Sequence, residues 1–231
     1  MKRMKRPSFY PPLSCGLWFL LLGLGIVFML LLFFQVLSVG FARLGLAPQQ
    51  VFLVIMGSFI GSGINIPIKT LRSGEQREIE FPSFLGMHYR VPVSRRRRTV
   101  LAVNVGGCVV PVLVSLYILY SLPAVRIPAL ICVAMASGLV YSMSKPVEGV
   151  GVATPFFAPP LLSALLAIVL APENAAAPVA YVTGSLGTLL GADIFNLRRI
   201  ARLGAPVASI GGAGTWDGIF LAGLLASLLA F

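Results

Sequence analysis

Histidine, cysteine and acidic residues are scarce in this chain, and their scarcity excludes several kinds of site. One histidine, three cysteines and seven aspartates or glutamates occur among 231 residues. No HExxH motif, Cys/His cluster or P-loop is present, so we expect neither a metal ion nor a cofactor. An intramembrane Ser–His hydrolase would need a histidine in a span, whereas His88 lies in a polar stretch.

Charged residues are also too few to cover a water-facing globule. They make up 11% of the chain, whereas a soluble domain has about 25%. Hydrophobic residues make up 58%, and they occur in runs of about 18 or more, long enough to cross a hydrocarbon core of roughly 30 Å. The composition therefore predicts one all-α membrane domain. Cys15, Cys108 and Cys132 are interpreted as small hydrophobic residues within it.

Seven apolar runs are predicted to be transmembrane helices, after a basic cytoplasmic leader at residues 1–12. The first run is about twice as long as a signal-peptide core, so we interpret it as a retained span. The last run is glycine-rich at residues 208–214, which predicts a break in its helix. The spans are Leu13–Ala42, Val51–Ile68, Val100–Tyr120, Ile127–Met143, Pro155–Ala171, Pro178–Leu197 and Pro206–Phe231.

Positive charge sets the predicted orientation. With a cytoplasmic N-terminus, all basic residues except Arg43 and Arg126 lie on the cytoplasmic side, as the positive-inside rule expects. We therefore predict a multi-pass protein of the cell (inner) membrane. Six spans and a re-entrant final segment form the competing topology. The net charge of +11 is attributed to contacts with anionic lipid head groups and not with nucleic acid.

The longest polar stretch, residues 69–98, is a predicted cytoplasmic loop within the domain formed by residues 13–231. β-type residues at 77–81 and 87–93 flank a turn-like segment, which favours a short surface hairpin. The stretch ends in Arg95, Arg96, Arg97 and Arg98. This run predicts an anchor at the lipid head groups.

The two aspartates are the strongest candidates for chemistry. All five glutamates lie in predicted loops, whereas Asp193 and Asp217 lie in the last two spans. A carboxylate at the centre of a membrane helix costs about 2.5–3.5 kcal/mol and by default marks a functional site. The short loop at residues 198–205 predicts antiparallel neighbouring spans. Two adjacent carboxyl groups share a proton, and such a pair can activate a water molecule.

Each aspartate also has a structural interpretation. Asp193 precedes Arg198 by about five residues, or roughly 7–8 Å of helix, so it could pair with Arg198 or Arg199 near the interface. Asp217 could cap a helix that begins near Thr215.

Small and amide residues surround the aspartates. Gly187 and Gly191 form a GxxxG pair that is typical of close helix packing. Asn196 is three residues from Asp193 and shares its helix face. The residues predicted to support the pair are Gly191, Asn196, Gly214, Thr215 and Gly218.

Three strings carry a resemblance to one family. They are GSFIGSGINIPI at residues 57–68, GADIFNL at 191–197 and SIGGAGTWDGIFLAG at 209–223. They resemble a family of bacterial and archaeal membrane proteins that is catalogued as domain of unknown function 1614. The resemblance extends from Val51 onward and implies a prokaryotic multi-pass membrane protein, with no established activity.

A more distant similarity is to presenilin-like and prepilin-peptidase-like intramembrane aspartyl proteases. Those enzymes carry one aspartate on each of two adjacent helices, the second in a GxGD motif. Residues Gly214 to Asp217 match the first glycine and the aspartate, with Trp216 in place of the second glycine. Asp193 would be the partner, and no Pro-Ala-Leu motif follows Asp217.

Three functions therefore remain open. An intramembrane aspartyl hydrolase would use Asp193 and Asp217 on a membrane-embedded peptide, which requires the carboxyl groups to lie within about 5–7 Å. A small transporter or channel would bind a cation, proton or small solute there, with glycine-rich backbone as further ligands. A scaffold would have no site. The glycine-rich faces also allow a homo-oligomer.

Overall fold

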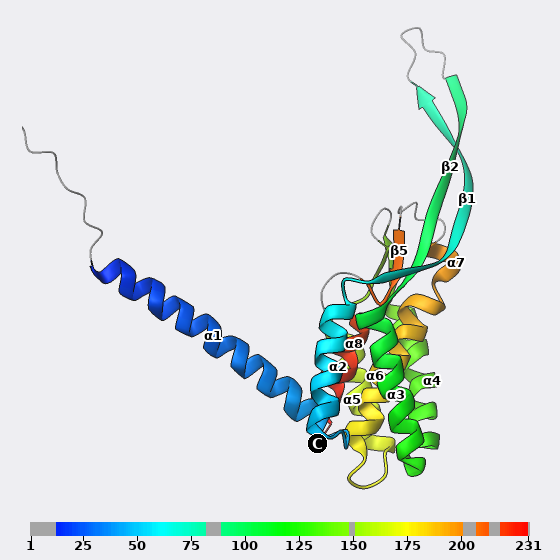
Figure 1. The fold of residues 1–231 in the computed structure, drawn as a ribbon. Helices are drawn as coiled ribbons and strands as arrows, with labels where there is room; N and C mark the ends of the chain where they lie inside the picture. The colour runs from blue at the N-terminus through cyan, green and yellow to red at the C-terminus, as the bar shows by residue number, and fades with distance from the viewer. Residues whose placement is uncertain (1–12, 82–88, 148–150, 201–206, 213–217, 231) are drawn as a thin grey trace, which may run out of the picture.

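The computed structural model describes residues 13–81, 89–147, 151–200, 207–212 and 218–230. Helices form a bundle, from which one long helix leaves at an angle and a long β-hairpin projects at the end opposite the C-terminus (Figure 1). The α-helices are α1 (Leu13–Ala42), α2 (Pro48–Gly61), α3 (Val110–Ser121), α4 (Arg126–Met143), α5 (Ala158–Leu170), α6 (Ala176–Thr188), α7 (Leu197–Ile200) and α8 (Gly218–Leu229).

Two helical segments among the described residues are long and apolar enough to cross a membrane. They are Trp18–Ala42 and Pro123–Met143, whereas the other apolar helices have at most 17 residues. The mostly helical character predicted from the sequence is confirmed, but the prediction of an all-α domain is wrong, because the described residues also form β-strands. The number of seven spans and the cytoplasmic N-terminus stay predictions.

Three of the predicted spans form shorter helices, because part of each of these three apolar runs is a strand. They are the runs at residues 51–68, 100–120 and 206–231. β1 (Asn65–Phe81) and β2 (Tyr89–Asn104) pair antiparallel, with Asn65 opposite Asn104. β5 (Val207–Ile210) pairs parallel with the base of β2, which gives the order β1-β2-β5. A separate pair of short strands is formed by β3 (Lys145–Val147) and β4 (Gly151–Ala153).

The hairpin is therefore longer than the sequence predicts. The predicted strands covered only its outer part, and the predicted turn Pro82–Gly86 lies outside the described residues. The first part of the last predicted span is the strand β5, and Gly211 follows it with a φ of +70°. The predicted break in that span thus contains a strand and a glycine turn.

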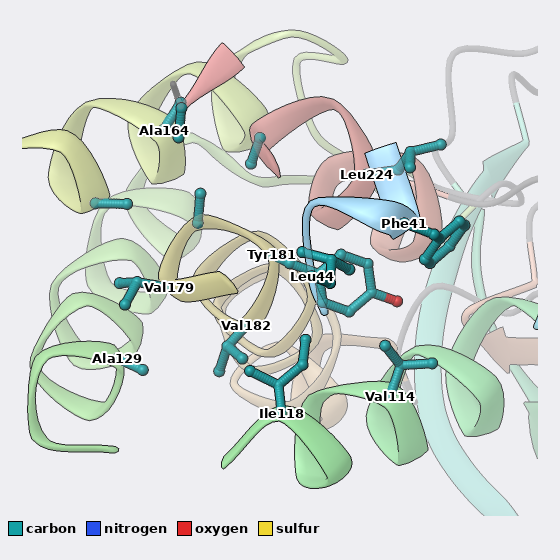
Figure 2. Packing of buried hydrophobic residues seen from close by; sticks show 14 of the residues in the cluster. Phe41, Leu44, Val114, Ile118, Ala129, Ala164, Val179, Tyr181, Val182 and Leu224 are labelled. Atoms are coloured by element: carbon teal, nitrogen blue, oxygen red, sulfur yellow. The ribbon is translucent and has the colours of Figure 1, made fainter. Parts of the chain in front are cut away.

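The hydrophobic core surrounds α6, which packs against α3, α4, α5 and α8. Tyr181 on α6 is fully buried, and its ring lies 5.9 Å from that of Phe41. Figure 2 shows this part of the core, in which Phe41, Leu44, Tyr181 and Leu224 belong to one cluster of buried side chains. α1 contributes through its C-terminal end, because most of its remaining large side chains are exposed. The buried cysteines Cys108 and Cys132 behave as predicted.

Glycines bring the backbone of α6 close to its neighbours. A Cβ atom on Gly184 would lie 2.5 Å from the Ala222 carbonyl oxygen on α8. On the α4 side, a Cβ on Gly187 would lie 3.0 Å from the Ala136 Cβ, and one on Gly191 would lie 2.5 Å from the Ser137 oxygen. The GxxxG pair is therefore a packing motif against α4.

We predict that Gly184→Ala destabilises the bundle by about 1–3 kcal/mol, because the added methyl group must force α6 away from α8. Gly138→Ala is the matched control, since Gly138 lies on α4 with no heavy atom within 4 Å of an added Cβ. That control should keep or raise stability, because alanine favours the helix. Thermal unfolding of the detergent-solubilised protein, followed by circular dichroism, measures both. Equal midpoints for the two variants would contradict this packing account.

Candidate functional site

A polar junction lies where the three-stranded sheet meets the helix bundle. Asn104, at the end of β2, is 1% exposed. Its Nδ2 donates to the Ser62 carbonyl oxygen at 2.7 Å and to Asn65 Oδ1 at 3.2 Å. Its Oδ1 accepts the Gly107 N–H at 2.7 Å, which caps the π-helical segment Val105–Val109. One buried amide therefore ties together the end of α2, the base of the hairpin and the start of the α3 helical region.

Close backbone contact holds the same segments together. A Cβ atom on Gly61 would lie 2.8 Å from the Gly106 backbone nitrogen, and one on Gly106 would collide with the Ser58 carbonyl oxygen. The Ser58 hydroxyl donates to the Gly106 carbonyl oxygen at 2.8 Å. Only residues without a side chain allow this approach.

The segment after β5 completes the junction. Ser209 Oγ donates to Asn65 Oδ1 at 2.5 Å. Gly211 has φ of +70°, a backbone conformation that L-residues with a Cβ rarely adopt. A Cβ there would also lie 2.6 Å from the Cys108 Cβ. The turn is thus seated directly on the π-helical segment that Asn104 caps.

Asp193 reaches this junction from α6. It lies in a second π-helical segment, Leu189–Ile194, and is partly buried. Its Oδ2 accepts the backbone N–H of Gly211 at 3.2 Å. π-helical turns are rare and often occur at functional sites. Here two of them contact the same glycine turn, and one carries the candidate acid.

The other predicted site residues have mixed outcomes. Asn196 is fully buried, and its Nδ2 donates to the carbonyl oxygens of Gly191 and Ala192 at 3.1 and 3.0 Å. Arg199 donates to Asn196 Oδ1 at 3.3 Å and lies 5.1 Å from the centroid of the Tyr141 ring. Asn196 thus binds two backbone carbonyl groups within the π-helical segment that carries Asp193.

In the C-terminal half of the predicted site, the structure describes the residues up to 212 and from 218 onward. Gly218 is exposed and begins α8. Gly214, Thr215 and Asp217 lie outside the described residues. Among the residues that the structure describes, no group of three His, Cys, Asp or Glu side chains could hold a metal ion.

The contact between α6 and α8 shows where Asp193 and Gly218 lie along the length of the bundle. Gly184 on α6 lies level with Ala222 on α8. Asp193 lies nine residues after Gly184, in the π-helical segment that continues α6, which is at most about 14 Å at a rise of 1.5 Å per residue. Gly218 is four residues before Ala222, or about 6 Å on the same scale. α6 and α8 run in opposite directions, so both residues lie toward the sheet end of the bundle (Figure 1).

Sequence reasoning missed two members of the junction. Asn196 was among the predicted site residues, whereas Asn65 and Ser209 were not. A usable signal was present, because Asn65, Asp193 and Ser209 each lie in one of the three strings that carry the family resemblance. Those strings are distant in the sequence and meet at this junction.

We predict that Asn104→Ala is strongly destabilising, with about 1–3 kcal/mol lost for each buried group left unpaired. Asn65→Ala is the matched control, because Asn65 is exposed and shares one of the same hydrogen bonds. It should cost less than about 1 kcal/mol by the same reasoning. The midpoints of thermal unfolding show which of the two variants is less stable. If Asn65→Ala is the more destabilising change, the junction does not depend on Asn104.

The family comparison covers the part of the chain that contains this junction. A family model described as a protein of unknown function, DUF1614, matches residues 59–229. The matched range includes Asn65, Asn104 and Asp193 and leaves out α1. No curated protein and no solved structure matches the chain. The chain therefore belongs to the DUF1614 family.

Proposed function

We propose that the helix bundle is embedded in the membrane, with the hairpin on the cytoplasmic side. Large apolar side chains are exposed on the outer faces of the bundle as well as along α1. Examples are Phe52 on α2, Leu113 on α3, Leu130 on α4 and Leu165 on α5, which are each 58–62% exposed. Soluble monomers rarely expose such extended apolar surface, and lipid tails would cover it. The excess of arginine in the hairpin supports the cytoplasmic placement.

Within this bundle we propose an intramembrane aspartyl hydrolase that uses Asp193 and Asp217. The hydrogen bond from the Gly211 N–H to the Asp193 carboxylate supports this most directly. It places Asp193 against Gly211, and Asp217 follows Gly211 by six residues in the sequence. Gly218, the next residue after Asp217, begins α8 toward the same end of the bundle as Asp193.

Two carboxyl groups at this position could hydrolyse a peptide bond without a metal ion. Two like charges in close proximity do not both ionise readily, so one carboxyl group keeps its proton. The ionised group takes a proton from water as the water oxygen attacks the peptide carbonyl carbon. The protonated group donates to the carbonyl oxygen, and the tetrahedral intermediate then collapses with protonation of the leaving amine. The substrate would be a membrane-embedded peptide segment.

One observation also favours a cation- or proton-coupled transporter. The Asp193 carboxylate contacts the glycine turn at Gly211, and Asn65 Oδ1 and the Ser209 hydroxyl lie beside Gly212 in the same turn. Such oxygens are the ligands that hard cations prefer, and interrupted helices bind ions in several transporters. This second function requires Asp193 and produces no cut peptide.

Asp193→Asn and Asp217→Asn should each abolish peptide cleavage, because neither variant can share one proton between two carboxyl groups. Membranes that contain each protein at equal abundance are incubated, and new peptide termini are identified by mass spectrometry. The wild-type protein should generate termini within membrane-spanning segments of other proteins.

Glu173→Gln is the control, since Glu173 is an exposed acid in the loop between α5 and α6, at the other end of the bundle. It should cleave like the wild-type protein. Cleavage that persists in both aspartate variants contradicts the hydrolase. Absence of cleavage in the wild type, with aspartate-dependent cation or proton flux in liposomes, would instead identify the transporter.

A further inference from the structure

The hairpin carries its charge unevenly along its length. The inner half comprises Lys69–Gln76 on β1 and Ser94–Leu101 on β2, and it contains six basic residues and one acidic residue. The outer half comprises Arg77–Phe81 and Tyr89–Val93, and it contains two basic and two acidic residues. The excess positive charge is therefore confined to the half that adjoins the bundle.

The strand register leaves most of this charge without an acid directly opposite. Arg98 lies opposite Arg72, Arg97 opposite Ser73, and Arg96 opposite Gly74. Glu75 is opposite Arg95. In the outer half, Arg90 lies opposite Glu80. Like charges at opposed positions destabilise a strand pair. A bound anion would therefore reduce the electrostatic repulsion among the basic residues of the inner half.

The base of the hairpin has a defined height above the bundle. Thr99 is fully buried, and Leu101 belongs to a small core with Cys108 and Ile210. At a rise of about 3.3 Å per residue, Arg98 lies about 3 Å beyond Thr99 and Arg95 about 13 Å beyond it. Arg90 lies about 30 Å beyond Thr99 on the same scale. The head-group layer on each side of a bilayer is about 5–8 Å thick.

We propose that the inner half of the hairpin is a binding surface for the anionic phospholipid head groups of the membrane that holds the bundle. The proposal rests on the membrane placement proposed above and does not depend on Asp193 or Asp217. On this scale Arg95–Arg98 lie within the height of the head-group layer and the ionic atmosphere next to it, which decays over about 8 Å. The outer half lies beyond this range and carries no excess charge.

Position also favours lipid over nucleic acid as the source of phosphate. A nucleic acid bound along the hairpin would require excess positive charge over its whole length, whereas here the excess is confined to the inner half. Phospholipid phosphates occur only at the membrane end. The confined charge therefore matches a lipid surface.

The experiment compares two double variants that each remove two positive charges. Arg96→Gln/Arg98→Gln changes the inner half, and Arg77→Gln/Arg90→Gln changes the outer half. Each full-length protein is reconstituted into vesicles of equal parts phosphatidylcholine and phosphatidylglycerol. It is then extracted in mild detergent, and the bound lipids are quantified by mass spectrometry.

The wild-type protein and the outer variant should retain phosphatidylglycerol over phosphatidylcholine, and the inner variant should lower that ratio by about tenfold. Retention of the ratio in both double variants overturns the proposal. An equal loss in both overturns it as well, because attraction would then depend on net charge and not on height. Oligonucleotide binding that depends on Arg96 and Arg98, without lipid selectivity, would also overturn it. Resistance to alkaline carbonate extraction tests the membrane placement separately.

Discussion

The structure depends on close backbone contact between glycine-bearing segments where the sheet meets the bundle. Gly61 and Gly106 bring the end of α2 against the π-helical segment before α3. Gly211 places the turn after β5 on the same segment. Without these approaches the sheet would have no fixed position on the helices. Asp193 would then not reach the Gly211 N–H.

This constraint explains why polar groups gather at one end of an otherwise apolar bundle. A chain that changes from helix to strand leaves backbone donors and acceptors unpaired, and each is costly away from water. Asn104 pairs with such groups on two segments, and Asn196 does so at the π-helical turn of α6. The Asp193 carboxylate accepts another of these backbone donors. A structural requirement and a candidate reactive group therefore occupy the same place.

Much of the helical architecture could be predicted from the sequence, because long apolar runs have few other solutions. α1 has the predicted bounds, Leu13–Ala42, and α4 begins one residue before its predicted start. The strands at Asn65 and Val207 were taken into spans, since Ile66, Ile68 and Val207 are as apolar as helix residues. Hydropathy alone does not distinguish a short apolar strand from the end of an apolar helix.

The candidate site was predictable only in part, for a similar physical reason. Asp193 was found because a carboxylate is rare in an apolar run. Asn65 and Ser209 were missed, since each gains its role from a contact 144 residues away in the sequence. The Gly211 contact likewise depends on a strand that the sequence pattern did not reveal. What the sequence did indicate was that three strings resemble one family, and residues from all three meet at the junction.

The most direct test is the separation of residues 193 and 217 in the membrane. Asp193→Cys/Asp217→Cys is introduced into protein in which Cys15, Cys108 and Cys132 are replaced by alanine. The pair is treated with a thiol cross-linker that spans about 5–7 Å, the separation expected of two carboxyl groups that share a water molecule. Rapid cross-linking of the double variant within one chain is the result expected if the two carboxyl groups form a catalytic pair. Cross-linking only by reagents longer than about 12 Å would contradict it, since no water molecule could then contact both acids.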